Sequence, residues 1–96
     1  MRHRYLVTYD VCDDKRLRRV FKKMKTFGLH LQLSVFECEL SQRELAIMKT
    51  ALDGIINHDL DQVLIADLGP AGGRGDDCID ALGLPYHPKE RKSVVV

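Results

Sequence analysis

The sequence predicts an α+β domain in which an antiparallel sheet carries two helices on one face, and three observations predict this class. An apolar segment at 4–10 runs directly into a helical pattern that ends near residue 28. A second helical pattern follows at 41–56, and alternating segments at 30–40 and 61–69 supply further strands. With 96 residues, the chain is predicted to form one domain with a single core.

The first strand and the first helix follow each other closely. Residues 4–10 are rich in Leu, Val, Thr and Tyr, as in a strand that is buried on both faces and central in its sheet. Asp13 and Asp14 offer an N-cap and favourable negative charge for a first helical turn. A core-facing helical stripe is formed by Leu17, Val20, Phe21, Met24 and Phe27. Gly28 is predicted to end this helix.

The middle of the chain contains a strand, a helix and another strand. Because apolar and β-branched positions alternate, residues 30–40 are predicted to form one long second strand. Ser41 and Glu44 form a capping box that begins the second helix. The buried side of that helix is predicted at Leu45, Met48, Leu52, Ile55 and Ile56. Residues 61–69 are predicted to form the third strand.

A C-terminal extension of the single domain 1–96 begins at about residue 69. It opens with the glycine-rich segment GPAGGRG at 69–75, which lacks the GK[ST] ending of a phosphate-binding P-loop and is predicted to be a flexible loop. A short helical turn is predicted at 76–82, followed by brief apolar pieces at 84–87 and 93–96.

This order of elements is that of a ferredoxin-like βαββαβ sandwich, in which both helices cover one face of the sheet. The other face stays open. Because the strands carry apolar side chains on that open face, we expect a second copy of the chain to cover it, giving a homodimer through the sheet face.

Cysteine content and hydropathy indicate the cellular compartment in which the protein is expected. Cys12, Cys38 and Cys78 are odd in number and widely spaced, so they are predicted to be reduced packing residues. The sequence has neither an apolar stretch long enough to span a bilayer nor an apolar N-terminal signal. We therefore expect a cytoplasmic protein without a membrane partner.

Charge is divided unevenly along a chain whose formal net charge is +1. Residues 1–36 carry nine Lys and Arg against three Asp, whereas residues 37–96 carry six against eleven acids. The first helix contains Lys15, Arg16, Arg18, Arg19, Lys22, Lys23 and Lys25, with no acid from residue 15 to residue 35. A solvated helix face normally mixes signs, so this helix predicts salt-dependent binding of a nucleic-acid backbone. The alternative is a merely basic surface.

Asp10, at the end of the central strand, is the leading candidate for chemistry. A carboxylate there needs solvent, a cap or a cation, because burying it unpaired is costly. Magnesium takes about six oxygens and usually one or two carboxylates, so one Asp10 cannot hold it, whereas two copies facing each other across a twofold axis could. The alternative is a strand-end aspartate that accepts backbone N–H bonds. Ser34 and Phe36 could likewise touch a nucleotide or simply pack.

Two segments of the chain carry a family resemblance. YDVCDDKRLRRVFKKMKTFG at 9–28, followed by LQLSVFECELS at 31–41, resembles the small CRISPR-associated family that partners the CRISPR integrase during spacer acquisition in antiviral defence. Members are often described as metal-dependent endonucleases. The similarity also includes DQVLIADLG at 61–69 and covers about two thirds of the chain.

The resemblance implies a ferredoxin-like homodimer in which two Asp10 carboxylates approach each other and share one Mg²⁺ or Mn²⁺. It matches Tyr9 to the aromatic residue before the acid, and it makes Arg16 and Arg19 phosphate contacts. The family's most regular helix arginine aligns with Leu17, so no single arginine stands out. The complete predicted nucleic-acid contact set is Tyr9, Arg16, Arg18, Arg19, Lys22, Ser34 and Phe36.

Two functions follow, and they do not exclude each other. The first is a homodimeric endonuclease that cleaves RNA or DNA phosphodiesters, with Asp10 as both catalytic and metal-binding residue. The second is a non-catalytic dimeric scaffold that bridges CRISPR integrase subunits and binds duplex DNA through its basic helices, while Asp10 is structural. A more remote third is a small-molecule regulatory domain of the same fold, against which the seven helix cations argue.

Overall fold

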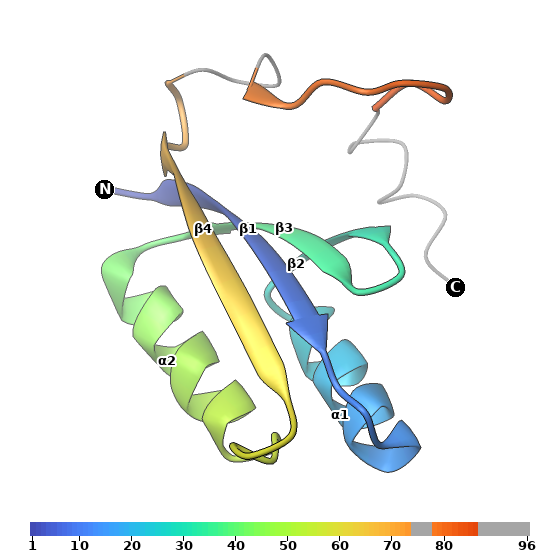
Figure 1. Ribbon diagram of the computed structural model, residues 1–96. Helices are drawn as coiled ribbons and strands as arrows, with labels where there is room; N and C mark the ends of the chain where they lie inside the picture. The colour runs from blue at the N-terminus through green and yellow to red at the C-terminus, as the bar shows by residue number, and fades with distance from the viewer. Residues whose placement is uncertain (74–77, 87–96) are drawn as a thin grey trace.

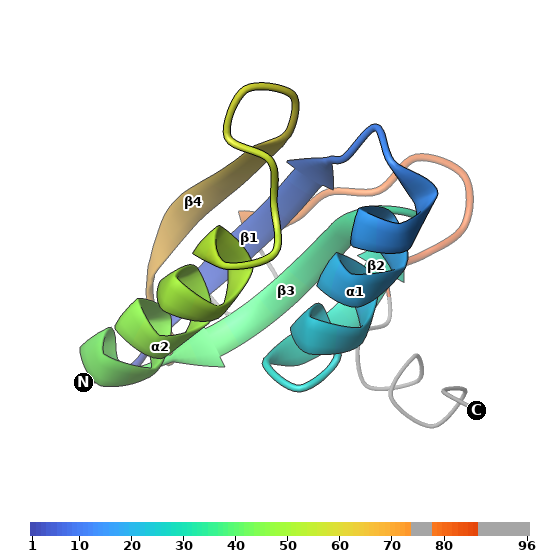
Figure 2. The same ribbon diagram turned by 90° about the horizontal axis from the view of Figure 1, so that it is seen from below.

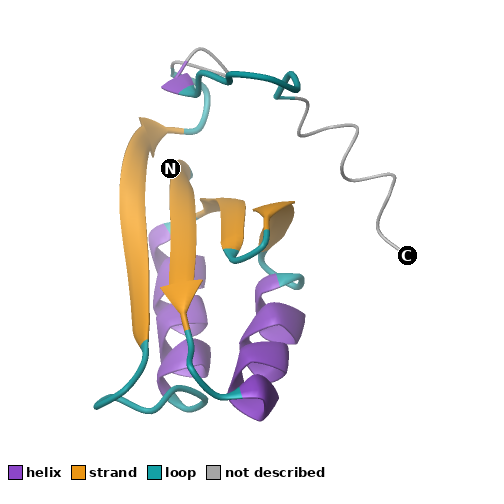
Figure 3. Cartoon of the chain, turned by 45° about the vertical axis from the view of Figure 1, so that its right-hand side comes forward, coloured by secondary structure: helices purple, strands orange, loops and turns teal. Residues whose placement is uncertain are grey.

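The computed structural model, which describes residues 1–73 and 78–86, is a two-layer α+β sandwich (Figure 1). Its elements are β1 (His3–Asp10), α1 (Asp14–Met24), β2 (Gly28–Gln32), β3 (Val35–Leu40), α2 (Gln42–Asp53) and β4 (Gln62–Pro70). The strands form one antiparallel sheet in the order β2-β3-β1-β4, and both helices cover the same face of it (Figures 2 and 3). This confirms the predicted ferredoxin-like fold, with β1 in the interior of the sheet.

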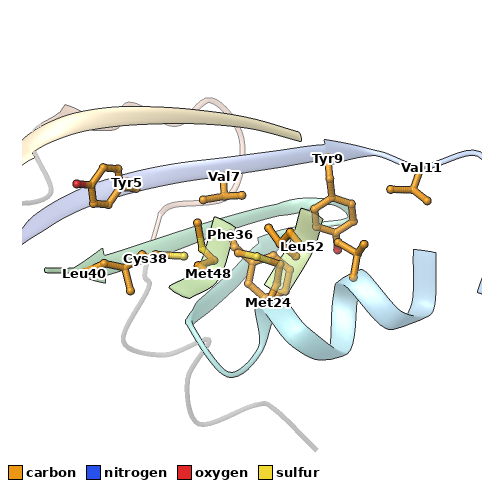
Figure 4. Packing of buried hydrophobic residues seen from close by; sticks show 11 residues of the cluster. Tyr5, Val7, Tyr9, Val11, Met24, Phe36, Cys38, Leu40, Met48 and Leu52 are labelled. Carbon is orange, nitrogen blue, oxygen red and sulfur yellow. The ribbon is translucent and has the colours of Figure 1, made fainter. Parts of the chain in front are cut away.

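The core lies between the sheet and the two helices. Tyr5, Val7 and Tyr9 alternate along β1 and point toward the helices, as Figure 4 shows. They pack with buried residues of the other elements, namely Val20, Met24, Phe36, Cys38, Leu40, Met48 and Leu52. The remaining residues of the predicted stripes also pack against this cluster as partly buried residues. Phe27, Ile55 and Ile56 do so from beyond the ends of α1 and α2, so the stripes are confirmed only within the helices.

The prediction of one strand over residues 30–40 is wrong. The chain turns at Leu33 and Ser34, so that β2 and β3 form an antiparallel hairpin in which Gln32 lies opposite Val35. The turn contains no Gly, Pro, Asn or Asp, and Ser34 is its one residue of a type that is common in turns. It is fixed from outside instead, since the Tyr9 amide donates to the Ser34 carbonyl at 3.1 Å.

The predicted N-caps are confirmed, whereas the role assigned to Gly28 is wrong. Asp13 accepts the Arg16 amide at 3.0 Å, and the capping box of Ser41 and Glu44 is complete. Helix α1 already ends at Met24 with a right-handed cap. Gly28 opens β2, where a Cβ would collide with the carbonyl of the facing strand. Neither helix of the described chain has the length and apolar content that a membrane crossing needs.

Residues 78–86 lie on the sheet face opposite the helices and pass behind the sheet in Figure 2. The Tyr86 hydroxyl donates to the Glu37 carboxylate, which also binds Arg4 Nε at 2.9 Å, and Arg4 Nη1 donates to Cys78 Sγ at 3.5 Å. This stretch therefore covers the β2–β3 side of the open face. On the β1–β4 side, Leu64 is 56 % exposed.

The C-terminal extension departs from its prediction where it is described. Strand β4 continues to Pro70, so the glycine-rich loop begins later than residue 69. Cys78 lies in a 3₁₀ turn, which agrees with the short helical turn predicted at 76–82, whereas residues 79–86 form neither a helix nor a strand. The predicted piece at 93–96 lies outside the described residues. All three cysteines are free. Cys38 is buried and Cys78 is partly buried, whereas Cys12 is exposed, so the prediction of a packing role is wrong for Cys12.

Candidate functional site

Asp10 is the last residue of β1 and lies opposite Gln62 of β4. Because Tyr9 points into the core, alternation places Asp10 on the open face of the sheet, where it is exposed. No side-chain partner for Asp10 occurs within residues 1–73 and 78–86. The sheet therefore presents a carboxylate to solvent at the end of a buried strand.

A second carboxylate, Asp61, organises the loop that follows Asp10. Its Oδ2 accepts Arg16 Nε at 2.7 Å and the Asn57 amide at 2.8 Å, and its Oδ1 accepts Arg16 Nη2 and the Cys12 amide, both at 3.2 Å. The Asp61 side chain is 0 % exposed. Hydrogen bonds from Arg16, supported by the two amides, hold the pKa of Asp61 well below its usual range.

Sequence reasoning missed Asp61 because its partners come from three separate segments of the chain. The only local signal was an acid at the first position of the strand predicted at 61–69. Its burial gives Arg16 an internal role, since the guanidinium that was expected to hold phosphate is bound to Asp61 and its side chain is only 23 % exposed.

An open cavity of about 460 Å³ lies beside Asp10, between the start of α1 and the β2–β3 turn. Its apolar lining includes Leu17, Phe21 and Leu33, and its polar groups include Asp10 and Arg18. Tyr9 and Ser34 complete part of the wall. The structure thus brings four predicted site residues together: Tyr9, Asp10, Arg18 and Ser34.

The other predicted cations lie elsewhere on α1. Arg19 and Lys22, together with Lys23, line a groove of about 480 Å³ between α1 and the end of α2. Thr26 and Gly54 lie in the same groove, which does not include Asp10. The cations therefore divide between two surfaces of the helix, and of the four cations in the predicted nucleic-acid contact set only Arg18 lines the cavity at Asp10.

Phe36 is fully buried rather than exposed at the site. Its ring lies 5.8 Å from that of Phe21, 6.2 Å from that of Tyr9 and 4.9 Å from that of His30. The ring thus supports the cavity wall from behind and has no free surface for a nucleotide within the chain. Tyr9 is only 5 % exposed, and burial raises the pKa of its phenol.

The carboxylates of one chain do not amount to a metal centre. In the described part of the chain, no group of three or more His, Cys, Asp or Glu side chains could hold a metal ion. The Asp61 carboxylate is already filled by hydrogen bonds, and Asp13 caps α1. At the cavity, the described residues therefore offer a metal only the Asp10 carboxylate, fewer ligands than magnesium takes from most proteins and their bound substrates.

Comparisons with known proteins place the chain in a family. The family model described as "CRISPR associated protein Cas2" matches residues 1–72. The "CRISPR-associated endoribonuclease Cas2" of Geobacter sulfurreducens is 43 % identical over 96 residues and is matched over 100 % of both chains. "CRISPR-associated endoribonuclease Cas2 1" of Rhodospirillum rubrum is 40 % identical over 94 residues, which cover 98 % of this chain and 91 % of that relative.

Solved structures agree with this relationship. Streptococcus pyogenes Cas2 superposes with a TM-score of 0.73 at 34 % identity, covering 83 % of this chain and 99 % of that one. A hypothetical protein from Thermus thermophilus, TT1823, superposes with a TM-score of 0.78 at 27 % identity, covering 92 % and 99 % of the two chains. By sequence over its whole length and by fold, the chain belongs to the CRISPR-associated Cas2 family.

Proposed function

We propose that this chain is an endoribonuclease of CRISPR-associated defence and that Asp10 carries its chemistry. The observation that supports this most is the exposed Asp10 carboxylate at the end of a buried strand, beside a cavity that also contains Arg18. A carboxylate and a guanidinium at one cavity suit a phosphodiester substrate, because the cation binds the phosphate that the acid would act upon. The relatives named as endoribonucleases add support.

The chain's own residues have separate tasks in this proposal. Arg18 holds the phosphate next to Asp10, while Arg19 and Lys22 neutralise phosphates farther along the strand. Arg16 and Asp61 fix the loop between Asp10 and α1. If two Asp10 carboxylates held one Mg²⁺ or Mn²⁺, the ion would supply activated water and stabilise developing phosphate charge.

We further propose a homodimer through the uncovered part of the open sheet face. Residues 78–86 cover the β2–β3 side, whereas Leu64 and Ala66 of β4 are exposed on the other. Leu64 lies opposite Thr8 in the β1–β4 register, two residues from Asp10. A twofold axis over this apolar patch would bring two Asp10 side chains close together.

A second candidate function is a non-catalytic scaffold that binds duplex DNA and bridges CRISPR integrase subunits. Two observations favour it. The described residues of one chain supply no metal centre, and Arg19, Lys22 and Lys23 form a basic groove that does not include Asp10. Such a groove can bind DNA through its phosphates without catalysing a reaction.

Cleavage assays with matched variants test the proposed activity. Purified wild type, Asp10→Asn and the control Asp14→Asn are incubated with single-stranded RNA, single-stranded DNA and duplex DNA, each with Mg²⁺, with Mn²⁺ and with EDTA. Asp14 is an exposed acid in the first turn of α1, so its substitution matches the lost charge. We expect RNA cleavage by wild type and Asp14→Asn but not by Asp10→Asn. Cleavage that survives in Asp10→Asn would overturn the proposal, and DNA binding without any cleavage would favour the scaffold.

A further inference from the structure

The cavity beside Asp10 is more apolar than phosphate binding alone requires. Leu17 and Phe21 of α1, Val11 after β1 and Leu33 of the β2–β3 turn all line it. A site that bound only the sugar-phosphate backbone would need cations and amides rather than this lining. The apolar surface therefore calls for an apolar or aromatic part of the ligand.

Leu33 is the most informative of these residues. Its side chain is 93 % exposed, so it contributes little to the core, yet the turn that carries it is held in place. The Ser34 carbonyl accepts the Tyr9 amide at 3.1 Å, and the Leu33 carbonyl lies 3.1 Å from His30 Nε2. A large apolar side chain is thus held in solvent at the rim of the cavity that contains Asp10.

We propose that this cavity receives one unpaired base of the nucleic acid, placing the adjoining phosphate between Arg18 and Asp10. The inference rests on the proposed function and adds to it a subsite for a base beside the phosphate. Bases in a duplex are stacked and paired, whereas an unpaired base can turn its flat face onto apolar and aromatic side chains. Leu33 and Phe21 supply such surfaces, and Arg18 supplies the charge for the phosphate beside that base.

Binding measurements with intact and base-free strands test the proposal. Fluorescence polarisation compares a labelled single-stranded oligoribonucleotide with the same backbone lacking its bases, and gels verify that the strand stays intact. Leu33→Ser should weaken binding of the intact strand about fivefold, as expected for loss of part of the apolar area that the base buries, and leave the base-free strand unchanged. Arg18→Gln should weaken both strands by a similar factor, because it removes a phosphate contact.

Two further variants control for folding and location. Ile47→Ser removes another exposed apolar side chain, which lies on α2 and is 51 % exposed. This change should alter the affinity for neither the intact strand nor the base-free strand. Leu33→Phe should retain or strengthen binding of the intact strand. If Leu33→Ser weakened the binding of both strands equally, or of neither strand, the base-binding inference would be overturned. The endonuclease proposal would instead fail on the absence of cleavage, so the two failures are distinguishable.

Discussion

Arg16 binds the buried Asp61 carboxylate through two contacts, Nε to Oδ2 at 2.7 Å and Nη2 to Oδ1 at 3.2 Å. The same carboxylate accepts the amides of Cys12 and Asn57. One side chain thus joins the loop after β1, the first turns of α1 and the loop before β4. The consequence is that the backbone next to Asp10 is held by contacts that lie outside the proposed substrate site.

Replacing Asp61 by Asn should lower the free energy of unfolding, because Arg16 loses its charged partner. Since the pKa of Asp61 is depressed in the folded chain, its contribution is fully present above the unfolded pKa of about 3.9 and is lost as the pH falls below that value. In urea unfolding, the difference in free energy of unfolding between wild type and Asp61→Asn should therefore be constant from about pH 5 to pH 8. It should become smaller below about pH 4. A difference that stays constant down to pH 3 would contradict this role.

Gly28→Ala should destabilise the fold by about 1–3 kcal/mol, the usual cost of overpacking. An added Cβ would collide with the Glu37 carbonyl and lie 2.6 Å from Cys38 Sγ. Gly54→Ala is the matched control, because its Cβ would meet nothing closer than 3.7 Å, and we expect it to change stability by less than about 1 kcal/mol. Equal unfolding midpoints for the two variants would contradict the close contact between Gly28 and the Glu37 carbonyl.

Salt dependence should separate the arginines of α1. Arg18→Gln and Arg19→Gln should each make the plot of log affinity against log salt less steep. The decrease should be roughly the amount expected for the loss of one phosphate contact. Arg16→Gln should leave that slope almost unchanged, because its guanidinium is bound to Asp61. Measurements on one oligonucleotide across a salt series decide this, and a slope that falls only in Arg16→Gln would refute the division of the helix cations.

Phe36→Leu should lower stability while leaving RNA affinity intact. The ring is fully buried against Phe21, Tyr9 and His30, so the change costs about 1 kcal/mol of packing. Affinity is to be measured well below the melting temperature, so that every molecule is folded. A loss of affinity in a fully folded Phe36→Leu protein would contradict this prediction and show that the ring matters to the site beyond its contribution to stability.

Local signals in the sequence were enough for most of the fold. The Asp13 cap, the Ser41 and Glu44 box and the apolar stripe of α1 act within a few residues, and each appears as predicted. The β2–β3 turn was missed because Ser34 by itself is a weak turn signal and the Tyr9 amide of β1 holds the turn in place. Contacts between distant segments decide such features, and they leave no local pattern.

In the candidate site, too, local features could be predicted and contacts between distant segments could not. The position of Asp10 followed from a strand ending in an acid, whereas the pairing of Arg16 with Asp61 joins residues 45 positions apart. Composition placed seven cations on one helix but could not say which of them line the cavity at Asp10. That distinction depends on how α1 is rotated against the sheet, which the packing of Val20 and Met24 determines.

The shared use of Asp10 by two chains is tested most directly by mixing wild type and Asp10→Asn in equal amounts, after unfolding and refolding them together. If each site needs two Asp10 carboxylates, RNA cleavage per total protein should fall to about a quarter of the wild-type rate, because only dimers with two wild-type chains are active. If each chain works alone, the rate should fall to about half. A rate of one half would contradict the shared site.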